Sequence, residues 1–423
     1  MYSSATPSLA LWRDLTPLPQ PLVKPQPHSK HVLIIGGGVI GLTTSWVLLD
    51  QGFKVTIISK EWASFGRRQR LASQVAGTVW EYPHTHDRNS KRWCMDAYRI
   101  WNDIAAHSSV PGVKMVFSSV CFLKDDQAQL DKMKEIRESG VAGFTRGQHL
   151  NTEHNIYNPY GTMDAYSFLA PTIDTDATMA WLMYLVKAKG AVLHTETIRG
   201  DLSSQELELR RKWGVDVIVN CTGIGSVETA SDNTCYPSRG AFIHLINDGI
   251  DFPKVDSVLT IRSSGRRKER VVLVPRNDNT LLLGAVSEPD NWHLNLTLDS
   301  PVIQRMRARC ELFLPFLRNA RVNPSRPLSQ GLRPSRQGSI RVERESVSFV
   351  ENNTSDFRRG NTTQSRIIHS YGHGDDGWTL AFGCAGDVSE IVKEVLGRDE
   401  KGQIQSLPSS ELPLHQPPLY SRM

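Results

Sequence analysis

The stretch that decides the fold runs from residue 31 to residue 49 and reads HVLIIGGGVIGLTTSWVLL. Its start, Val32 to Ile35, is typical of a buried parallel strand, and its later apolar residues have the pattern of a helix. Gly36, Gly38 and Gly41 stand between the two as G-x-G-x-x-G. In this context the glycines allow a tight turn, close approach of a pyrophosphate and close packing of helix on strand. The stretch therefore predicts a dinucleotide site at the amino terminus of the helix.

A membrane span is one alternative for this stretch, because the run from Val32 to Leu49 is long and carries no charge. The glycines, the hydroxyl residues at 43–45 and a second apolar run at 54–59 weigh against it. A glycine-rich turn without a ligand is the other alternative. The strand, helix and second strand around the glycines favour the nucleotide site over that reading.

The acidic residue that dinucleotide sites place near the ribose, about 20 positions after the glycines, is displaced here. Ser59 and Lys60 stand at the end of the second strand, and Glu61 follows one step later. Two roles therefore stay open: Glu61 holds the ribose hydroxyls, or Lys60 lies over the adenosine side.

The composition is that of a globular protein with a full core. The 423 residues include 39% hydrophobic and 22% charged residues, and the length predicts two domains. A net charge of +5 from scattered basic residues argues against a nucleic-acid partner, whose groove needs a broad basic stripe. The six cysteines contain no C-x-x-C pair, so we expect neither a metal site nor a disulfide scaffold.

The two ends of the chain differ in composition from its middle. Residues 1–28 are rich in proline and have little apolar periodicity, which predicts a disordered arm and no signal peptide. Residues 401–423 predict a flexible tail that stops at Ser421-Arg422-Met423. Because this tripeptide is close to the S-K-L address that an import receptor reads, we expect a peroxisomal protein, with the cytoplasm as the other location.

The pieces with α/β character are separated along the chain, and strand-like runs such as Ala241 to Ile246 lie between them. We predict an α/β fold with a Rossmann-type dinucleotide domain assembled from three segments: 29–92, 172–226 and 334–400. A β-rich, α+β substrate domain is interleaved with it in two segments: 93–171 and 227–333.

Four further blocks of sequence resemble signatures of the D-amino-acid oxidase family, which includes D-aspartate oxidase-like flavoenzymes. They are SQVAGTVW at 73–80, DVIVNCTG at 216–223, GLRPSR at 331–336 with RVERE at 341–345, and IIHSYGHGDDGWT at 367–379 followed by GCA at 383–385. Their order and spacing match the family over most of the chain. The resemblance implies that the dinucleotide is FAD, and that the protein oxidises a carbon–nitrogen bond and passes electrons to oxygen.

The resemblance also implies that FAD lies against all three segments of the dinucleotide domain. The residues that we expect at the cofactor are Gly36, Gly38, Val39, Ile40, Gly41, Ser59, Lys60, Ser73, Ala76, Gly77, Ile198, Cys221, Thr222, Gly223, Gly374, Gly377, Trp378 and Thr379. The glycine-rich turn after Tyr371 can bring backbone N–H groups near the flavin, where amide dipoles stabilise negative charge on the reduced ring.

Arg333 is the residue that we expect to bind substrate. In the resembled family the matching arginine grips the substrate carboxylate, and a planar guanidinium suits two oxygens held in one plane. A structural salt bridge is the alternative role, with Glu343 or Glu345 as the partner. Arg336 is expected to serve structure.

The region expected around the substrate departs from the family. Val272 and Lys268 stand where the family has tyrosines, and the loss of a phenol makes the pocket more apolar. Asp375 and Asp376 follow Gly374, where the family has glycine and then usually tyrosine. The Asp375 carboxylate has two open roles, pairing with a substrate ammonium or pointing to solvent. Three aromatic residues line the pocket or belong to the core: Trp80, Tyr82 and Trp378.

The implied reaction is the oxidative deamination of a D-amino acid. A hydride passes from the α-carbon to flavin N5, the imine hydrolyses to a 2-oxo acid and ammonia, and oxygen becomes hydrogen peroxide. An oxidoreductase that tailors a secondary amine or an amino acid derivative in secondary metabolism is the alternative. A flavoprotein without turnover, its pocket blocked by Asp375, is a third hypothesis. We expect a small amine or amino acid and oxygen as partners, and a homodimer as the assembly.

Overall fold

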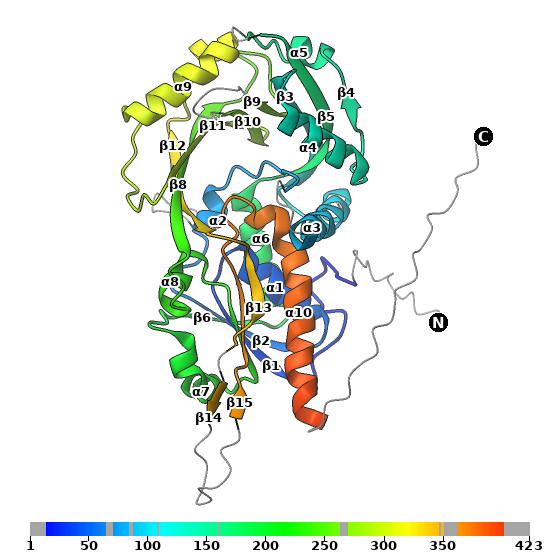
Figure 1. Ribbon diagram of the computed structural model, residues 1–423, viewed down its shortest axis with the longest axis vertical. Helices are drawn as coiled ribbons and strands as arrows, with labels where there is room; N and C mark the ends of the chain where they lie inside the picture. Colours follow the sequence, from blue (N-terminus) through cyan, green and yellow to red (C-terminus); the bar gives the residue numbers. More distant parts are fainter. Residues whose placement is uncertain are drawn as a thin grey trace, which may run out of the picture.

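The computed structural model describes residues 14–64, 71–83, 88–107, 110–158, 161–262, 270–346, 348–350 and 362–401. The molecule is elongated, with one large sheet toward each end (Figure 1). The described strands are β1 (His31–Ile35), β2 (Lys54–Ser59), β3 (Val113–Leu123), β4 (Thr145–Arg146), β5 (Met163–Ile173), β6 (Val192–Thr195), β7 (Val217–Asn220), β8 (Cys235–Ile246), β9 (Val258–Arg262), β10 (Arg270–Asn277), β11 (Thr280–Pro289), β12 (Leu328–Arg336), β13 (Arg341–Arg344), β14 (Ser348–Val350), β15 (Thr362–Gln364) and β16 (Ile367–Tyr371). The described α-helices are α1 (Val39–Asp50), α2 (Ala72–Val75), α3 (Arg88–Ala106), α4 (Gln127–Glu138), α5 (His149–Glu153), α6 (Thr175–Ala188), α7 (Leu202–Trp213), α8 (Ser226–Thr229), α9 (Pro301–Phe313) and α10 (Gly377–Lys401).

The first sheet holds six strands in the order β13-β16-β7-β1-β2-β6. Strands β16, β7, β1, β2 and β6 run parallel, and β13 pairs antiparallel with β16 at one edge. Strand β1 is central, with Val32 paired to Val55 on one side and to Val217 on the other. Because parallel strands end at the same edge of a sheet, the residues that follow β1, β2, β7 and β16 come together there.

Both faces of this sheet are buried, which explains why β1 reads as an unbroken apolar run. Val32 and Ile34 belong to the core that includes residues of α1, α6 and α10. Leu33 and Ile35 face the other way and pack in a cluster with Leu202 of α7. Alternate side chains of β1 therefore pack against helices on opposite faces of the sheet.

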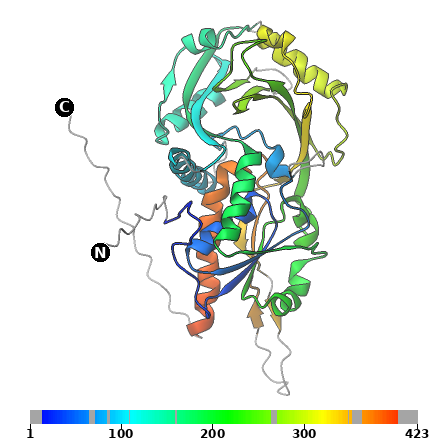
Figure 2. The same ribbon diagram turned by 180° about the vertical axis from the view of Figure 1, so that it is seen from behind.

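Helix α1 lies against α6 and α10 on one face of the sheet (Figure 2). Where these helices meet, the Trp46 ring makes edge-to-face contacts with Trp181 and Phe382 at centroid distances of 5.4 Å and 5.3 Å. The apolar stretch that also suggested a membrane span is thus β1, the glycine turn and α1 of the first βαβ unit. In the described part of the chain, no helix has the length and apolarity that a bilayer crossing needs.

The second sheet has eight strands in the order β12-β8-β11-β10-β9-β3-β5-β4. Its neighbours pair antiparallel except β3 and β9, which are parallel. Helix α9 packs on β11 and adds Ile303, Met306 and Phe313 to the core of this sheet. The predicted α/β fold class, with an interleaved β-rich part, is confirmed. The segment limits of the two domains stay a prediction, and the four limits between the domains fall inside α3, β5, α8 and β12.

The described part of the amino-terminal segment is ordered, so the prediction of a disordered arm over residues 1–28 is wrong for residues 14–28. Leu15 and Thr16 are each only 2% exposed. The Asp50 carboxylate, at the end of α1, accepts hydrogen bonds from the backbone N–H of Thr16 (2.9 Å) and of Leu22 (3.2 Å). It also pairs with the Lys189 ammonium at 2.6 Å, with both side chains fully buried. The proline-rich composition concealed this anchor because the partners lie in distant elements.

Some predicted features lie outside the described residues. They are the side chain of Lys268, residues 1–13 of the predicted arm and the predicted tail beyond Lys401, with Ser421-Arg422-Met423 at its end. The six cysteines are all described, and all are buried thiols that form no disulfide among the described residues. Among the described residues, no cluster of histidine, cysteine or acidic side chains has the arrangement of a metal site.

We predict that Asp50→Ala lowers the free energy of unfolding by about 3–5 kcal/mol, because it leaves the buried Lys189 ammonium without its partner. Denaturant unfolding followed by tryptophan fluorescence measures the change. Lys114→Ala is the control, since it removes an ion pair of 2.8 Å with Asp278 in which both side chains are exposed. That change is expected to stay within about 1 kcal/mol. Equal effects of the two substitutions would contradict the anchoring role of Asp50.

Candidate nucleotide and substrate site

A cavity of about 1150 Å³ opens where the strands of the first sheet end. Its walls come from the residues after β1, β2, β7 and β16, and from β8 and β12 of the second sheet. All the residues predicted at the cofactor line it except Gly41, and both predicted catalytic residues, Arg333 and Asp375, line it too. Segments that are far apart in the sequence therefore share one cavity.

The turn between β1 and α1 has no room for side chains at two of its glycines. A Cβ atom at Gly36, where φ is +125°, would lie 2.2 Å from the carbonyl oxygen of Cys221 on the neighbouring strand's end. A Cβ atom at Gly41 would lie 1.9 Å from the carbonyl oxygen of Gly36. Gly41 thus lies behind the cavity and lets the helix approach the turn, which is the packing role expected of the third glycine.

The amino terminus of α1 is open toward the cavity. Its N-cap residue is Gly38, which has no side chain to cap the helix, and its first turn carries no acidic residue. The backbone N–H groups of Gly37 and Val39 donate to the hydroxyls of Ser59 (3.1 Å) and Ser73 (3.0 Å). A helix start of this kind, with hydroxyl groups beside it, suits a diphosphate.

One end of the cavity is polar and lies beside the end of β2. Ser59, Lys60 and Glu61 line it, together with residues 196–199 that follow β6. The Ser59 hydroxyl donates to the backbone oxygen of Glu61 at 2.5 Å. Because Lys60 and Glu61 both line the cavity, the two roles proposed for the ribose and adenosine remain open.

The loop between β16 and α10 supplies a second glycine-rich wall. Gly372 and Gly374 have φ values of +84° and +54°, and the N–H of Gly374 donates to the carbonyl oxygen of Pro334 at 2.9 Å. Trp378 serves both of the roles left open for it: it lines the cavity, and it belongs to the buried core. Its indole N–H donates to the carbonyl oxygen of Ser73 at 2.9 Å, which joins two walls of the site.

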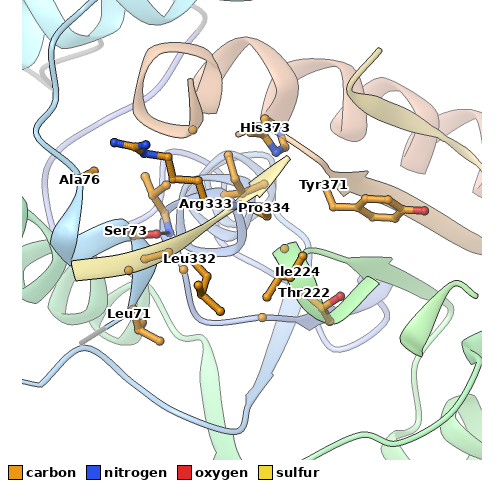
Figure 3. A pocket seen from close by; sticks show the side chains of 18 of the residues that line it. Leu71, Ser73, Ala76, Thr222, Ile224, Leu332, Arg333, Pro334, Tyr371 and His373 are labelled. Carbon is orange, nitrogen blue, oxygen red and sulfur yellow. Dashed lines mark hydrogen bonds between the residues drawn. The ribbon is translucent and has the colours of Figure 1, made fainter. Parts of the chain in front are cut away.

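Arg333 reaches the cavity from β12, as Figure 3 shows, with its side chain 16% exposed. Its Nε lies 2.7 Å from Asp375 Oδ1, and its Nη1 donates to the carbonyl oxygen of Val286 at 3.2 Å. The guanidinium lies directly over Gly240, where a Cβ atom would be 2.5 Å from Cζ. Burial lowers the pKa of Arg333, but a guanidinium remains charged at any physiological pH.

The expected alternative partners of Arg333 are engaged elsewhere. Glu343 pairs with Arg341 at 2.8 Å, and Glu345 contacts Arg341 at 3.3 Å and His369 at 2.9 Å. Asp375 also differs from both roles considered for it, because it joins two arginines. Its Oδ2 lies 3.6 Å from Nη2 of Arg270, while its other oxygen contacts Arg333.

Arg270 connects this pair to a buried carboxylate that the sequence did not reveal. Its Nη1 lies 2.8 Å from Glu81 Oε1, and Glu81 Oε2 is 2.7 Å from Arg262 and 3.3 Å from Lys132. Burial alone would raise the pKa of Glu81, but the three cations hold it well below its usual range. Glu81 is therefore ionised and organises the charges at this end of the cavity.

The more apolar pocket wall that the sequence predicts around Val272 is only partly present. Val272 is 1% exposed and packs with Phe242, and it is Phe242 that lines the cavity. Tyr82 lines the cavity, whereas Trp80 packs against Tyr98 in a separate core. Strand β10 contributes Arg270 to the wall instead of an apolar residue.

Two further cavity residues stand inside the motif HGDDG: His373, for which the sequence predicted no role, and Asp376, which it marked only as a departure from the family. Burial lowers the pKa of His373 to about 4, so its imidazole is neutral, and within the described residues its Nε2 atom has no hydrogen-bond partner. Burial, with help from Asp375 and Glu81, raises the pKa of Asp376 to about 7. His373 lines the cavity from the loop that follows β16 (Figure 3).

Comparison with known proteins places these features in context. A family model described as FAD dependent oxidoreductase, DAO, matches residues 31–391. D-amino-acid oxidase of Streptomyces coelicolor is 27% identical over 364 residues, covering 86% of this chain and 96% of the relative. D-amino-acid oxidase of Rubrobacter xylanophilus is 27% identical over 368 residues, covering 86% of this chain and 97% of the relative.

Solved structures share the fold. Glycine oxidase from Bacillus cereus has a TM-score of 0.61 at 16% identity, covering 88% of this chain and 96% of that one. L-α-glycerophosphate oxidase from Mycoplasma pneumoniae, solved with FAD bound, has a TM-score of 0.58 at 13% identity, covering 86% of this chain and 95% of that one.

The residues of the cavity fit FAD as the cofactor. The open start of α1 between Gly38 and Ser73 can hold the diphosphate, the polar end beside Lys60 and Glu61 can hold the adenosine, and the loop before α10 offers backbone groups to the ring.

We predict that Gly41→Ala abolishes or strongly weakens FAD binding, because its methyl group would overlap the Gly36 carbonyl and push α1 away from the turn. The ratio of visible to ultraviolet absorbance of the purified protein, with and without added FAD, measures cofactor content. Gly397→Ala is the matched control, since a Cβ atom at this α10 glycine meets nothing within 4 Å. It is expected to keep FAD. Full FAD content in the Gly41 variant would contradict the described turn.

Proposed function

We propose that this chain, which belongs to the DAO family of FAD-dependent oxidoreductases, catalyses the oxidative deamination of a D-amino acid to a 2-oxo acid, ammonia and hydrogen peroxide. The observation that carries the proposal is Arg333, a largely buried guanidinium in the wall of the FAD cavity. A planar cation in this position suits the α-carboxylate of an amino acid. The D-amino-acid oxidases similar to this chain over nearly their whole length support the same substrate class.

When bound, FAD supplies the hydride acceptor and passes the electrons to oxygen. The chain's own part is to orient the substrate. Arg333 holds the carboxylate, and its position is fixed by the Val286 carbonyl and by contact with Gly240, so the α-carbon is presented in one orientation. No strong base is needed if the amine enters neutral.

Apolar side chains form part of the cavity wall. Phe242, Trp292 and Leu294 line the cavity together with the aliphatic side chain of Leu332. In such surroundings, charge interactions are stronger than in bulk water. His373, neutral at the pH of catalysis, adds a polar group without adding charge.

The start of α10 supplies electrostatic support. This helix begins at Gly377, and residues 377–379 line the cavity. A long helix carries partial positive charge at its amino terminus, which stabilises negative charge that develops nearby. This is the role expected of the second glycine-rich turn.

A second candidate function is the oxidation of a secondary amine or amino acid derivative. The Asp375 carboxylate favours it, because it already lies on Arg333 and could instead face an amine. Peroxide assays with D- and L-amino acids, N-methyl amino acids and cyclic amines separate the two. Peroxide release from free D-amino acids supports the first function, and release only from amines without a carboxylate supports the second. Bound FAD with no peroxide from any compound would contradict both.

We predict that Arg333→Leu lowers kcat/KM for carboxylate-bearing substrates at least about a hundredfold, the effect of losing a charge-assisted bidentate contact. FAD content is expected to stay unchanged. Arg333→Lys keeps the charge but loses the planar fork, so it should restore only a small part of the activity. Arg336→Leu, on the same strand but paired with Asp232 at 2.9 Å, is the control for a general loss of an arginine. Loss of FAD in the Arg333 variants alone would show a structural role.

The peroxisomal location and the homodimer stay predictions. Import through Ser421-Arg422-Met423 is tested by the location of a fluorescent fusion with and without these three residues.

A further inference from the structure

The Asp375 carboxylate occupies the position on Arg333 that the proposed function gives to the substrate. One of its oxygens lies 2.7 Å from Arg333 Nε, and the other lies 3.6 Å from Arg270 Nη2. Both arginines and Asp375 line the FAD cavity. The chain therefore supplies its own carboxylate to the cation that is expected to recognise one.

Arg333 does not depend on Asp375 for its position. Its Nη1 donates to the Val286 carbonyl at 3.2 Å, and its guanidinium lies on Gly240 with no space between them for a side chain. Strand β12 is also held in register, with Arg333 opposite Ser238 and Gly331 opposite Gly240 on β8. The guanidinium can thus exchange one carboxylate for another without moving.

The position of Asp375, in contrast, allows its carboxylate to move away from Arg333. Its side chain is 47% exposed, while that of Arg333 is 16% exposed. It belongs to the loop between β16 and α10, directly after Gly374 with φ of +54°. It also lines a second cavity of about 660 Å³ that Ser335 and Ser339 share, so its carboxylate has polar space to enter. A half-exposed carboxylate gains hydration when it departs, whereas a buried arginine without any anion is strongly disfavoured.

The charges around the bridge favour the entry of a further anion. Arg270 and Arg333 line this end of the cavity, and two further cations, Arg262 and Lys132, pair with Glu81 in its wall. Glu81 forms ion pairs with Arg262, Arg270 and Lys132, and Asp375 forms ion pairs with Arg270 and Arg333. The remaining acid is Asp376, for which no contact with Arg333 is present among the described residues. Even with Asp376 ionised, the four cations outnumber the three carboxylates Glu81, Asp375 and Asp376, so an incoming carboxylate brings the local charge closer to neutral.

We propose that Asp375 is an internal, displaceable carboxylate ligand of Arg333, and that a substrate carboxylate must replace it to bind. This inference rests on the proposed function and names its substrate class: an amino acid with a free α-carboxylate and an apolar side chain. Competition from Asp375 weakens the binding of every carboxylate to Arg333 by the same factor. Selection therefore falls on the additional contacts with the apolar wall formed by Phe242, Trp292 and Leu294.

The test measures binding of a carboxylate to the holoenzyme without turnover. Benzoate is the probe, because it has a carboxylate and a ring but no amine to oxidise, and it is titrated while the visible flavin spectrum and the heat of binding are recorded. Asp375→Asn is expected to lower the dissociation constant of benzoate about tenfold, because benzoate no longer has to displace the Asp375 carboxylate from Arg333. Asp375→Ser carries the same test if the asparagine variant loses FAD.

Asp376→Asn is the matched control. Measured at pH 8.5, above the raised pKa of about 7, both substitutions remove one negative charge from the same loop. Only Asp375 contacts Arg333, so the Asp376 variant is expected to change benzoate binding less than about twofold. Chloride, a spherical anion, is titrated alongside, because a general rise in positive potential would strengthen chloride and benzoate together.

Selective tightening of benzoate in the Asp375 variants supports the proposal. Unchanged, weaker or undetectable benzoate binding in these variants overturns it, as does equal tightening in the Asp376 variant. None of these outcomes depends on peroxide release. A holoenzyme without oxidase activity would therefore refute the proposed function and leave the binding result to stand by itself.

Discussion

The structure depends on a backbone contact that excludes side chains. At the β1–α1 turn, the Gly41 position approaches the Gly36 carbonyl, and Gly36 approaches the Cys221 carbonyl beyond β7, each within a distance that no Cβ atom tolerates. This contact fixes the helix, the central strand and its neighbour relative to one another. Because β2 and β16 extend the same parallel sheet, their ends meet at that edge too, and the cavity follows from this arrangement.

The second sheet completes the site by bringing charge to it. Strands β8 and β12 run side by side along nine paired positions, and the absence of a side chain at Gly240 lets the Arg333 guanidinium lie flat on the neighbouring strand. Glu81, Arg270 and Asp375 then link the guanidinium to the loop before α10. The open helix start that suits a diphosphate thus belongs to the first sheet, while Arg270 and Arg333, the cations of the cavity wall, are carried by the second.

The sequence predicted what is encoded locally and failed where partners are distant. Strand β1 and the glycine turn followed from short patterns. The family resemblance pointed to Arg333, which lines the cavity, while its role and the segment limits of the domains stay predictions. Arg270 and Glu81 lie 189 positions apart, so no local pattern announces their contact. The same holds for Asp50 and Lys189, 139 positions apart, whose buried pair orders a segment that its composition marked as disordered. Asp375 was recognised as unusual, but its two arginine partners could be seen only once β10 and β12 were in place.

The burial of the six cysteines affects how readily peroxide would oxidise their thiols. Burial raises the pKa of Cys94, Cys121, Cys221, Cys235 and Cys310. Oxidants attack the thiolate form, which is scarce at neutral pH when the pKa is raised and the sulfur is shielded. If each catalytic cycle releases a molecule of peroxide, burial keeps these five thiols in their less reactive, protonated form.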